Sequence, residues 1–163
     1  MKNYEKYTFF YKMRHPFSNW HQCTFEDSRG TTYSCSEQYM MAEKARLFGD
    51  EATRLEILAT GNPSKQKELG RKVRHFDSKI WNENAKKIVY EGCKLKFTQN
   101  HRLLKSLLDT EGTLIVEASP YDRIWGIGLA EDDPAIHDPL NWNGLNWLRE
   151  VLTQLRDDLL EEE

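Results

Sequence analysis

Apolar and polar residues are distributed along the chain in runs that favour short strands and in periods that favour helices. The aromatic, β-prone run Tyr7–Lys12 favours an opening strand. Residues Cys23–Phe25 and Thr31–Tyr33 flank a turn-like stretch at 26–30, which predicts a hairpin. The apolar segment Thr113–Ala118 is the clearest strand of the sequence. These patterns predict little sheet, divided between the two halves of the chain.

Helices account for most of the remaining pattern. Ser34–Glu37 matches a capping box, so we expect a helix to begin there and to run to about Phe48. Other helices follow the N-cap residues Asp50, Asn62 and Asp77 or show an apolar period of 3.6 residues. The whole set is expected at about 34–48, 50–61, 62–73, 77–97, 101–108 and 145–160. The fold class is therefore α+β and mainly helical, in a single domain over residues 1–163.

Composition narrows the class of protein. The chain has 163 residues, 39% of them hydrophobic and 30% charged, which is typical of one compact globular domain. A formal net charge of −3 disfavours a dedicated duplex-binding protein, although it leaves room for a local basic cleft. Cys23, Cys35 and Cys93 form no CxxC pair, which is typical of reduced thiols in a cytoplasmic protein. The absence of an apolar leader or bilayer-length stretch predicts no membrane association.

Two charged residues fall on the apolar face of the helix expected at 34–48. Glu37 and Lys44 are seven residues apart, which places them within about 20° of each other on a helix. They lie near the middle of the spread that includes Met40, Met41 and Ala45. Burial of an unpaired charge costs several kcal/mol, so this pattern indicates function. The alternative is that Glu37 only completes the capping box and Lys44 extends to solvent. The neighbouring Glu43 is expected at the surface.

A second cluster follows the strand at Thr113–Ala118. Glu117 stands near the strand end, Asp122 comes five residues later in a loop that contains a proline, and Trp125 and Gly126 follow. Acids and an aromatic residue in such a loop are typical of the edge of a site. The glycines do not form a dinucleotide-binding fingerprint, and the alternative is that they only build a turn.

Basic, amide and aromatic side chains gather in the loop at 14–21. Arg14, Asn19 and Trp20 suit a phosphate and a stacked ring, but this mixture is also common in packed loops. Basic groups recur at 70–72, which includes Arg71, and at 94–99, where a solvated helix face is the alternative. The chain has no HExxH, P-loop or GxSxG motif, and its five histidines are scattered. We therefore expect no metal site and no cofactor.

The chain resembles the NADAR family, also called YbiA-like or DUF1768. The matching blocks occur in family order from about Phe9 to Leu155 and comprise FSNW, SEQYMMAEKARLFGD, LGRKV, KFTQN, VEASPYDRIWGIGL and WNGLNWL…LR. The resemblance implies a mainly helical α+β domain linked to NAD and ADP-ribose metabolism. It also implies N-glycosidase activity, which in one group acts on ribosylamino-pyrimidine phosphates of riboflavin synthesis and in another removes ADP-ribose from guanine bases.

The resemblance and the patterns above together give the candidate site. The catalytic candidates are Glu37, Lys44, Glu117 and Asp122. Candidates for substrate binding are Arg14, Asn19, Trp20, Arg71, Phe97, Trp125 and Gly126. We expect a small ribose-phosphate or ADP-ribose substrate, with ADP-ribosylated nucleic acid as a further partner, and no obligate protein partner. A module that binds ADP-ribose without turnover is the alternative. The acid and amine on one buried face argue against it, because simple binding rarely needs so costly an arrangement.

Overall fold

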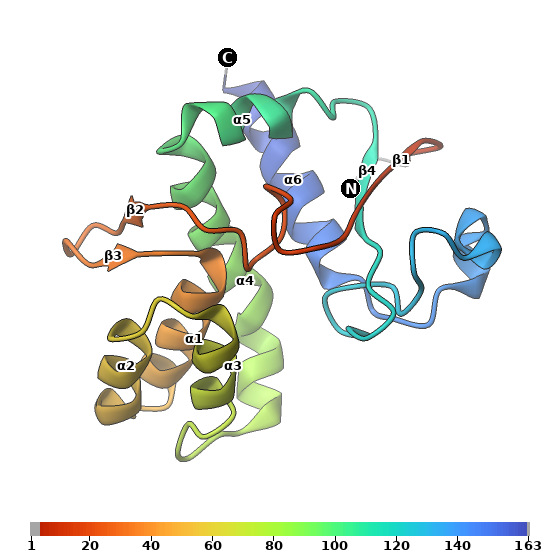
Figure 1. Ribbon diagram of the computed structural model, residues 1–163. Helices are drawn as coiled ribbons and strands as arrows, with labels where there is room; N and C mark the ends of the chain where they lie inside the picture. Colours follow the sequence, from red (N-terminus) through yellow and green to blue (C-terminus); the bar gives the residue numbers. More distant parts are fainter. Residues whose placement is uncertain (1–3, 163) are drawn as a thin grey trace. The chain divides into compact units, whose positions relative to one another are not determined.

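The computed structural model describes residues 4–162, so the outermost ends of the domain predicted at 1–163 lie outside the described residues. By its internal contacts the chain divides into two compact units. One unit is continuous and spans Asn19–His101; the other combines the two ends of the chain, Met1–Ser18 and Arg102–Glu163. Figure 1 shows the helices and strands of both.

Helix α1 (Ser36–Leu47) is the centre of the unit Asn19–His101. It contacts the three other helices of the unit and strand β3 (Thr32–Tyr33). Each of the other three helices of this unit begins at a side chain that accepts hydrogen bonds from the first turn, and these caps are the predicted Asp50, Asn62 and Asp77. The elements are β2 (Phe25–Glu26), β3 (Thr32–Tyr33), α1 (Ser36–Leu47), α2 (Glu51–Leu58), α3 (Pro63–Gly70) and α4 (Ser78–Thr98). Strands β2 and β3 pair antiparallel, so the predicted hairpin is confirmed.

Glycines let two helices pack closely on α1. A Cβ on Gly70 of α3 would lie 2.0 Å from the sulfur of Met41, and a Cβ on Gly92 of α4 would lie 2.5 Å from Cδ1 of Tyr39. Real Cβ atoms do not approach so closely, so a larger residue at either position would force the side chain of Met41 or Tyr39 to move. The result is that most of α1 is buried, including the polar residues of its first turn.

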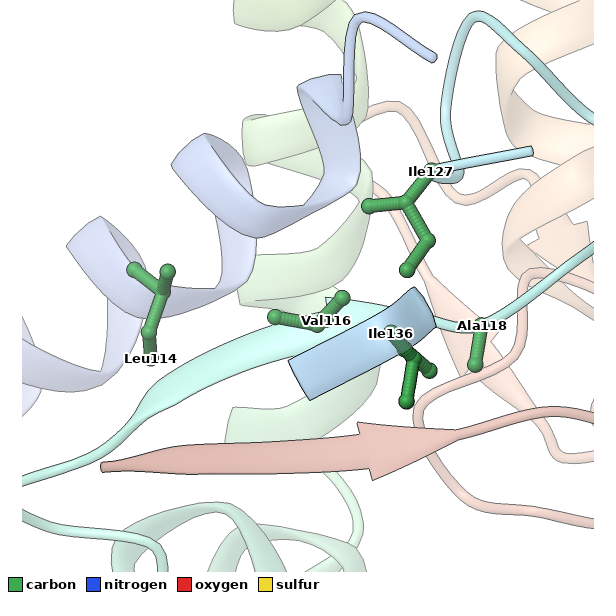
Figure 2. Packing of buried hydrophobic residues seen from close by; sticks show 5 residues of the cluster. All are labelled: Leu114, Val116, Ala118, Ile127 and Ile136. Carbon is green, nitrogen blue, oxygen red and sulfur yellow. The ribbon is translucent and has the colours of Figure 1, made fainter. Parts of the chain in front are cut away.

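The unit formed by the chain ends is built on two parallel strands. Strand β1 (Tyr7–Phe10) pairs with β4 (Leu114–Glu117), with Tyr7 opposite Leu114 and Phe10 opposite Glu117. Helix α6 (Trp147–Glu161) packs against β4. Figure 2 shows Leu114 and Val116 on this strand and Ala118 directly after it, together with Ile127 and Ile136 from the segments that follow. The unit also contains α5 (His101–Leu108) and the short 3-10 helices η1 (Pro134–His137) and η2 (Pro139–Asn141).

A fully buried arginine ties the start of this unit to its last helix. Arg156 of α6 has no exposed surface. Its Nη1 donates to the carbonyl oxygen of Thr110 at 2.8 Å and lies 3.2 Å from that residue's hydroxyl. Its Nε donates to Asp157 at 3.1 Å, and its guanidinium carbon lies 5.2 Å from the ring centroid of Tyr4. The Tyr4 hydroxyl in turn donates to Asp157.

The prediction of a mainly helical α+β fold is confirmed. Every predicted helix and strand is present, with ends that shift by a few residues. Over the described residues, no helix is both long and apolar enough to cross a membrane. The cytoplasmic location and the single domain stay predictions.

Candidate active site

The first turn of α1 is held by hydrogen bonds that it donates to Asn19, earlier in the chain. The backbone N–H of Glu37 donates to the carbonyl oxygen of Asn19 at 2.9 Å, and the hydroxyl of Ser36 donates to Oδ1 of Asn19 at 2.9 Å. Asn19 is itself buried, with 8% of its surface exposed. Asn19, a predicted substrate-binding residue, therefore has its side-chain oxygen engaged in positioning the start of α1.

The predicted capping box is wrong by one residue. The N-cap of α1 is Cys35, in an extended conformation and with no side-chain cap, so Glu37 is the second residue of the helix and not the third. The third residue, Gln38, accepts from the backbone N–H of Ser34 at 2.7 Å and from its hydroxyl at 3.2 Å. The bonds to Asn19 set the residue at which α1 begins, and the local sequence pattern gave no sign of these bonds. Glu37 therefore does not occupy the position that the capping box requires.

Glu37 and Lys44 form an electrostatically coupled pair on α1. Glu37 is 4% exposed and Lys44 is half-buried. Burial is the main cause that lowers the pKa of the Lys44 amine; Glu37 opposes this effect, and the nearby Arg71 adds to it. A lowered pKa increases the fraction of neutral amine at a given pH, which suits a proton carrier or a nucleophile. The placement of both residues on the buried face agrees with the helical period.

Two aromatic rings that the sequence reasoning missed lie against Lys44. Its Nζ is 4.6 Å from the ring centroid of Phe76 and 5.5 Å from that of Trp81. With Asp77 as the N-cap of α4, Phe76 is the residue before the cap and Trp81 the fourth of the helix, the two positions of a hydrophobic staple. That spacing could have indicated from the sequence that Phe76 and Trp81 occupy staple positions, but it does not predict that either ring contacts Lys44.

Two other charged residues near Glu37 and Lys44, Arg71 and Glu43, differ in their ion pairing. Arg71 follows the end of α3, is exposed, and makes no ion pair within the described part of the chain. Its guanidinium is therefore available to an anion such as a phosphate. Glu43 was expected at the surface, yet its side chain is only 16% exposed. It forms ion pairs with Arg46 at 3.2 Å and Arg29 at 3.9 Å.

Two further predicted binding residues of this unit are aromatic. Trp20 is half-buried. Phe97 of α4 has no exposed surface, and the Nζ of the equally buried Lys96 lies 5.0 Å from its ring centroid. Packing alone accounts for an aromatic residue at position 97, so its contact with substrate stays a prediction.

The predicted strand-loop cluster is a tight turn within the other unit. The hydroxyl oxygen of Ser119 accepts from the backbone N–H of Asp122 at 3.1 Å, and Oδ1 of Asp122 accepts from Ile124 and Trp125, both at 2.9 Å. A Cβ on Gly126 would lie 2.8 Å from the carbonyl oxygen of Asp122 and 3.0 Å from that of Glu117. The structure therefore brings Asp122, Trp125 and Gly126 into one loop after Glu117, the last residue of β4. Gly126 is required by close backbone packing, as in the turn explanation.

Trp125 and Arg14 complete the predicted residues of this unit. Trp125 is 9% exposed and packs edge-on against Trp147, with ring centroids 5.5 Å apart. Arg14 is exposed in the turn that follows β1, where Lys12 adopts a left-handed conformation with φ of 83°. Across the described residues, no group of three or more His, Cys, Asp or Glu side chains is arranged to hold a metal ion.

Comparison with known proteins identifies the family. The family model for the NADAR domain matches residues 9–160, which is nearly the whole chain. This chain belongs to the NADAR domain family. The resemblance seen in the sequence is thereby confirmed, and the match includes both compact units.

Three proteins with known names or structures are similar to this chain. The chain is 42% identical to N-glycosidase R617 of Acanthamoeba polyphaga mimivirus over 165 residues, which cover 94% of this chain and 96% of that protein. It is 30% identical to the chloroplastic riboflavin biosynthesis protein PYRR of Zea mays, covering 88% of this chain but 23% of that protein. The NMR structure of the Escherichia coli protein YbiA aligns with a TM-score of 0.79 and 27% identity, over 99% of this chain and 89% of that one.

Proposed function

We propose that this protein is an N-glycosidase that hydrolyses the bond between a nitrogen base and a ribose phosphate. The family includes relatives named for N-glycosidase activity, among them the mimiviral protein that matches nearly end to end. The observation that carries the proposal is the pair on α1, in which a carboxylate with 4% exposure acts electrostatically on a half-buried amine of lowered pKa. A pair of this kind is typical of catalytic sites and costly in a binding module.

The reaction gives Glu37 a defined task. The bond from C1′ to the base nitrogen breaks, the oxygen of water bonds to C1′, and a proton from that water ends on the leaving nitrogen. The transition state resembles an oxocarbenium ion, and a desolvated carboxylate stabilises its positive charge. Glu37 is that carboxylate in our proposal. Asp122 is the second candidate for charge stabilisation or proton transfer, and the roles of Asp122 and Glu117 stay predictions.

Lys44 and Arg71 supply the cationic side of the site. Arg71, exposed and without an ion pair among the described residues, suits the substrate phosphate. Lys44 has two chemical roles open to it. As an ammonium ion it orients Glu37 or binds phosphate. As a neutral amine it attacks the aldehyde carbon of the opened sugar and forms a Schiff base, while the aldehyde oxygen leaves as water. Borohydride reduction separates these roles, because only the Schiff base leaves a sugar covalently attached to Lys44.

The test is base release, measured by chromatography, from two substrates in parallel. One is a ribosylamino-pyrimidine phosphate, the substrate class suggested by the riboflavin biosynthesis relatives. The other is an oligonucleotide with an ADP-ribosylated guanine. Release from the first alone assigns the protein to removal of riboflavin intermediates, and release from the second alone assigns it to reversal of guanine ADP-ribosylation.

Four variants give the test its specificity. We expect Glu37→Gln and Lys44→Met each to lower kcat by about a hundredfold or more, the usual cost of losing a group that acts in the transition state. Glu51→Gln and Lys105→Met are matched controls, because both side chains are more than 60% exposed; they should keep wild-type activity. Affinity for ADP-ribose by calorimetry without base release from either substrate would contradict the proposal and support a binding module.

A further inference from the structure

Phe76 lies in an unusual place for an exposed aromatic residue. It follows His75, which adopts a left-handed backbone conformation with φ of 63°, and it precedes Asp77, the N-cap of α4. A residue with a Cβ is disfavoured in that conformation, so the backbone of this turn is strained. The ring of Phe76 is 46% exposed, and its described neighbours are the ring of Phe48 and the amine of Lys44.

The ring is oriented by one neighbour and acts on the other. Phe48 packs edge-on against Phe76, with centroids 5.4 Å apart and planes at 65°. The Nζ of Lys44 lies 4.6 Å over the Phe76 ring, within the range of a cation–π contact. The hydrophobic staple explains an apolar residue at position 76, but leucine serves that purpose as well as phenylalanine. The contact with Lys44 gives a reason for an aromatic face.

We propose that Phe76 is a positioning residue that holds the amine of Lys44 in place through its ring face. Trp81 contributes a second ring at 5.5 Å from the same nitrogen. The charged groups that act on Lys44 are Glu37 on its own helix and Arg71 after α3. From the turn before α4 and from α4 itself, the described contacts with the amine are the two rings. The rings favour the charged form of the amine, whereas burial and Arg71 favour the neutral form.

The substitution Phe76→Leu distinguishes the effect of the aromatic ring face from the effect of apolar packing at position 76. It keeps a side chain that fills the staple position and excludes water from Lys44, but it removes the π face. Phe76→Tyr keeps the face and serves as the conservative variant. Ile80→Leu is a control for the same segment, because Ile80 is 41% exposed.

The direct readout is acylation of Lys44 by an amine-reactive ester, followed by peptide mass spectrometry across a pH series. Rates are normalised to the plateau at high pH, which removes differences in access. Loss of the contact should raise the normalised rate below the plateau by about two- to five-fold in Phe76→Leu. Phe76→Tyr and Ile80→Leu should match wild type. Coincident profiles for the leucine, tyrosine and wild-type proteins would overturn the inference.

A second readout rests on the proposed function. In Phe76→Leu, kcat for base release should fall several-fold while KM stays close to wild type. In the separate variant Phe76→Tyr, kcat should stay close to the wild-type value. The two failures are distinguishable. Absence of base release in the wild-type protein would refute the proposed function and leave the acylation result standing. Normal kcat together with an unchanged acylation profile would refute the role of Phe76 alone.

Discussion

Replacement of the buried Arg156 by methionine should destabilise the protein strongly. The change removes the donor to the Thr110 carbonyl oxygen at 2.8 Å and the donor to Asp157 at 3.1 Å. It also removes the guanidinium from the face of the Tyr4 ring, 5.2 Å away. Methionine restores much of the apolar volume of the arginine side chain, so the cost comes mainly from polar groups that lose their partners.

The magnitude follows from the burial of those partners. Removal of one member of a fully buried ion pair costs about 3–5 kcal/mol. The Asp157 side chain is 16% exposed, so water recovers part of this loss. The Nη2 of Arg156 lies at ion-pair distance from Asp157 but is not aligned for a hydrogen bond, so the contact through this atom is weak. We therefore expect the free energy of unfolding to fall by about 2–4 kcal/mol.

Urea unfolding followed by circular dichroism measures this quantity. The control is Arg102→Met, which removes an exposed charge from α5 and should change the free energy of unfolding by less than about 0.5 kcal/mol. The double variant Arg156→Met with Asp157→Asn should recover part of the loss, because it removes the stranded carboxylate. A loss below about 1 kcal/mol in Arg156→Met would refute the reasoning, since Thr110 and Asp157 would then be satisfied without the guanidinium.

Two further predictions concern a helix cap and a strained asparagine. The hydrogen bonds from Arg74, followed by those from Thr53, lower the pKa of Asp50 below its ordinary value of 3.8. The stability from this cap is therefore fully present above that pH and is lost as pH falls toward the folded-state pKa. Urea midpoints from pH 6 to pH 2.5 should fall less in Asp50→Asn, and parallel curves would contradict this assignment. Asn146 is 2% exposed and left-handed with φ of 55°, and neither polar atom of its side chain has a partner among the described residues. Asn146→Gly should raise the unfolding free energy by about 1 kcal/mol, because relief of the buried amide outweighs the entropy cost of glycine; a lower melting temperature would show that the amide is satisfied.

Local patterns in the sequence predicted the helices and the two charged residues of α1, Glu37 and Lys44. Asp50, Asn62 and Asp77 cap their helices as predicted, because an N-cap bond spans only two or three residues. The positions of Glu37 and Lys44 on one face likewise follow from the helical period alone. The family was recognisable from blocks spread along the chain, and the family match over residues 9–160 confirms it.

Tertiary structure decided what depends on contacts between distant segments. Strand β1 pairs in parallel with β4 more than a hundred residues later, and no local pattern specifies such a partner. The carbonyl of Asn19 belongs to the chain before the hairpin, yet it sets the first turn of α1 and with it the place of Glu37 in the helix. The rings of Phe76 and Trp81 match a hydrophobic staple in the sequence, but only folding of α4 against α1 brings them to the amine of Lys44. Short-range hydrogen bonds fix where α2, α3 and α4 begin, whereas the start of α1 and the surroundings of its buried charges depend on groups that the tertiary fold brings together.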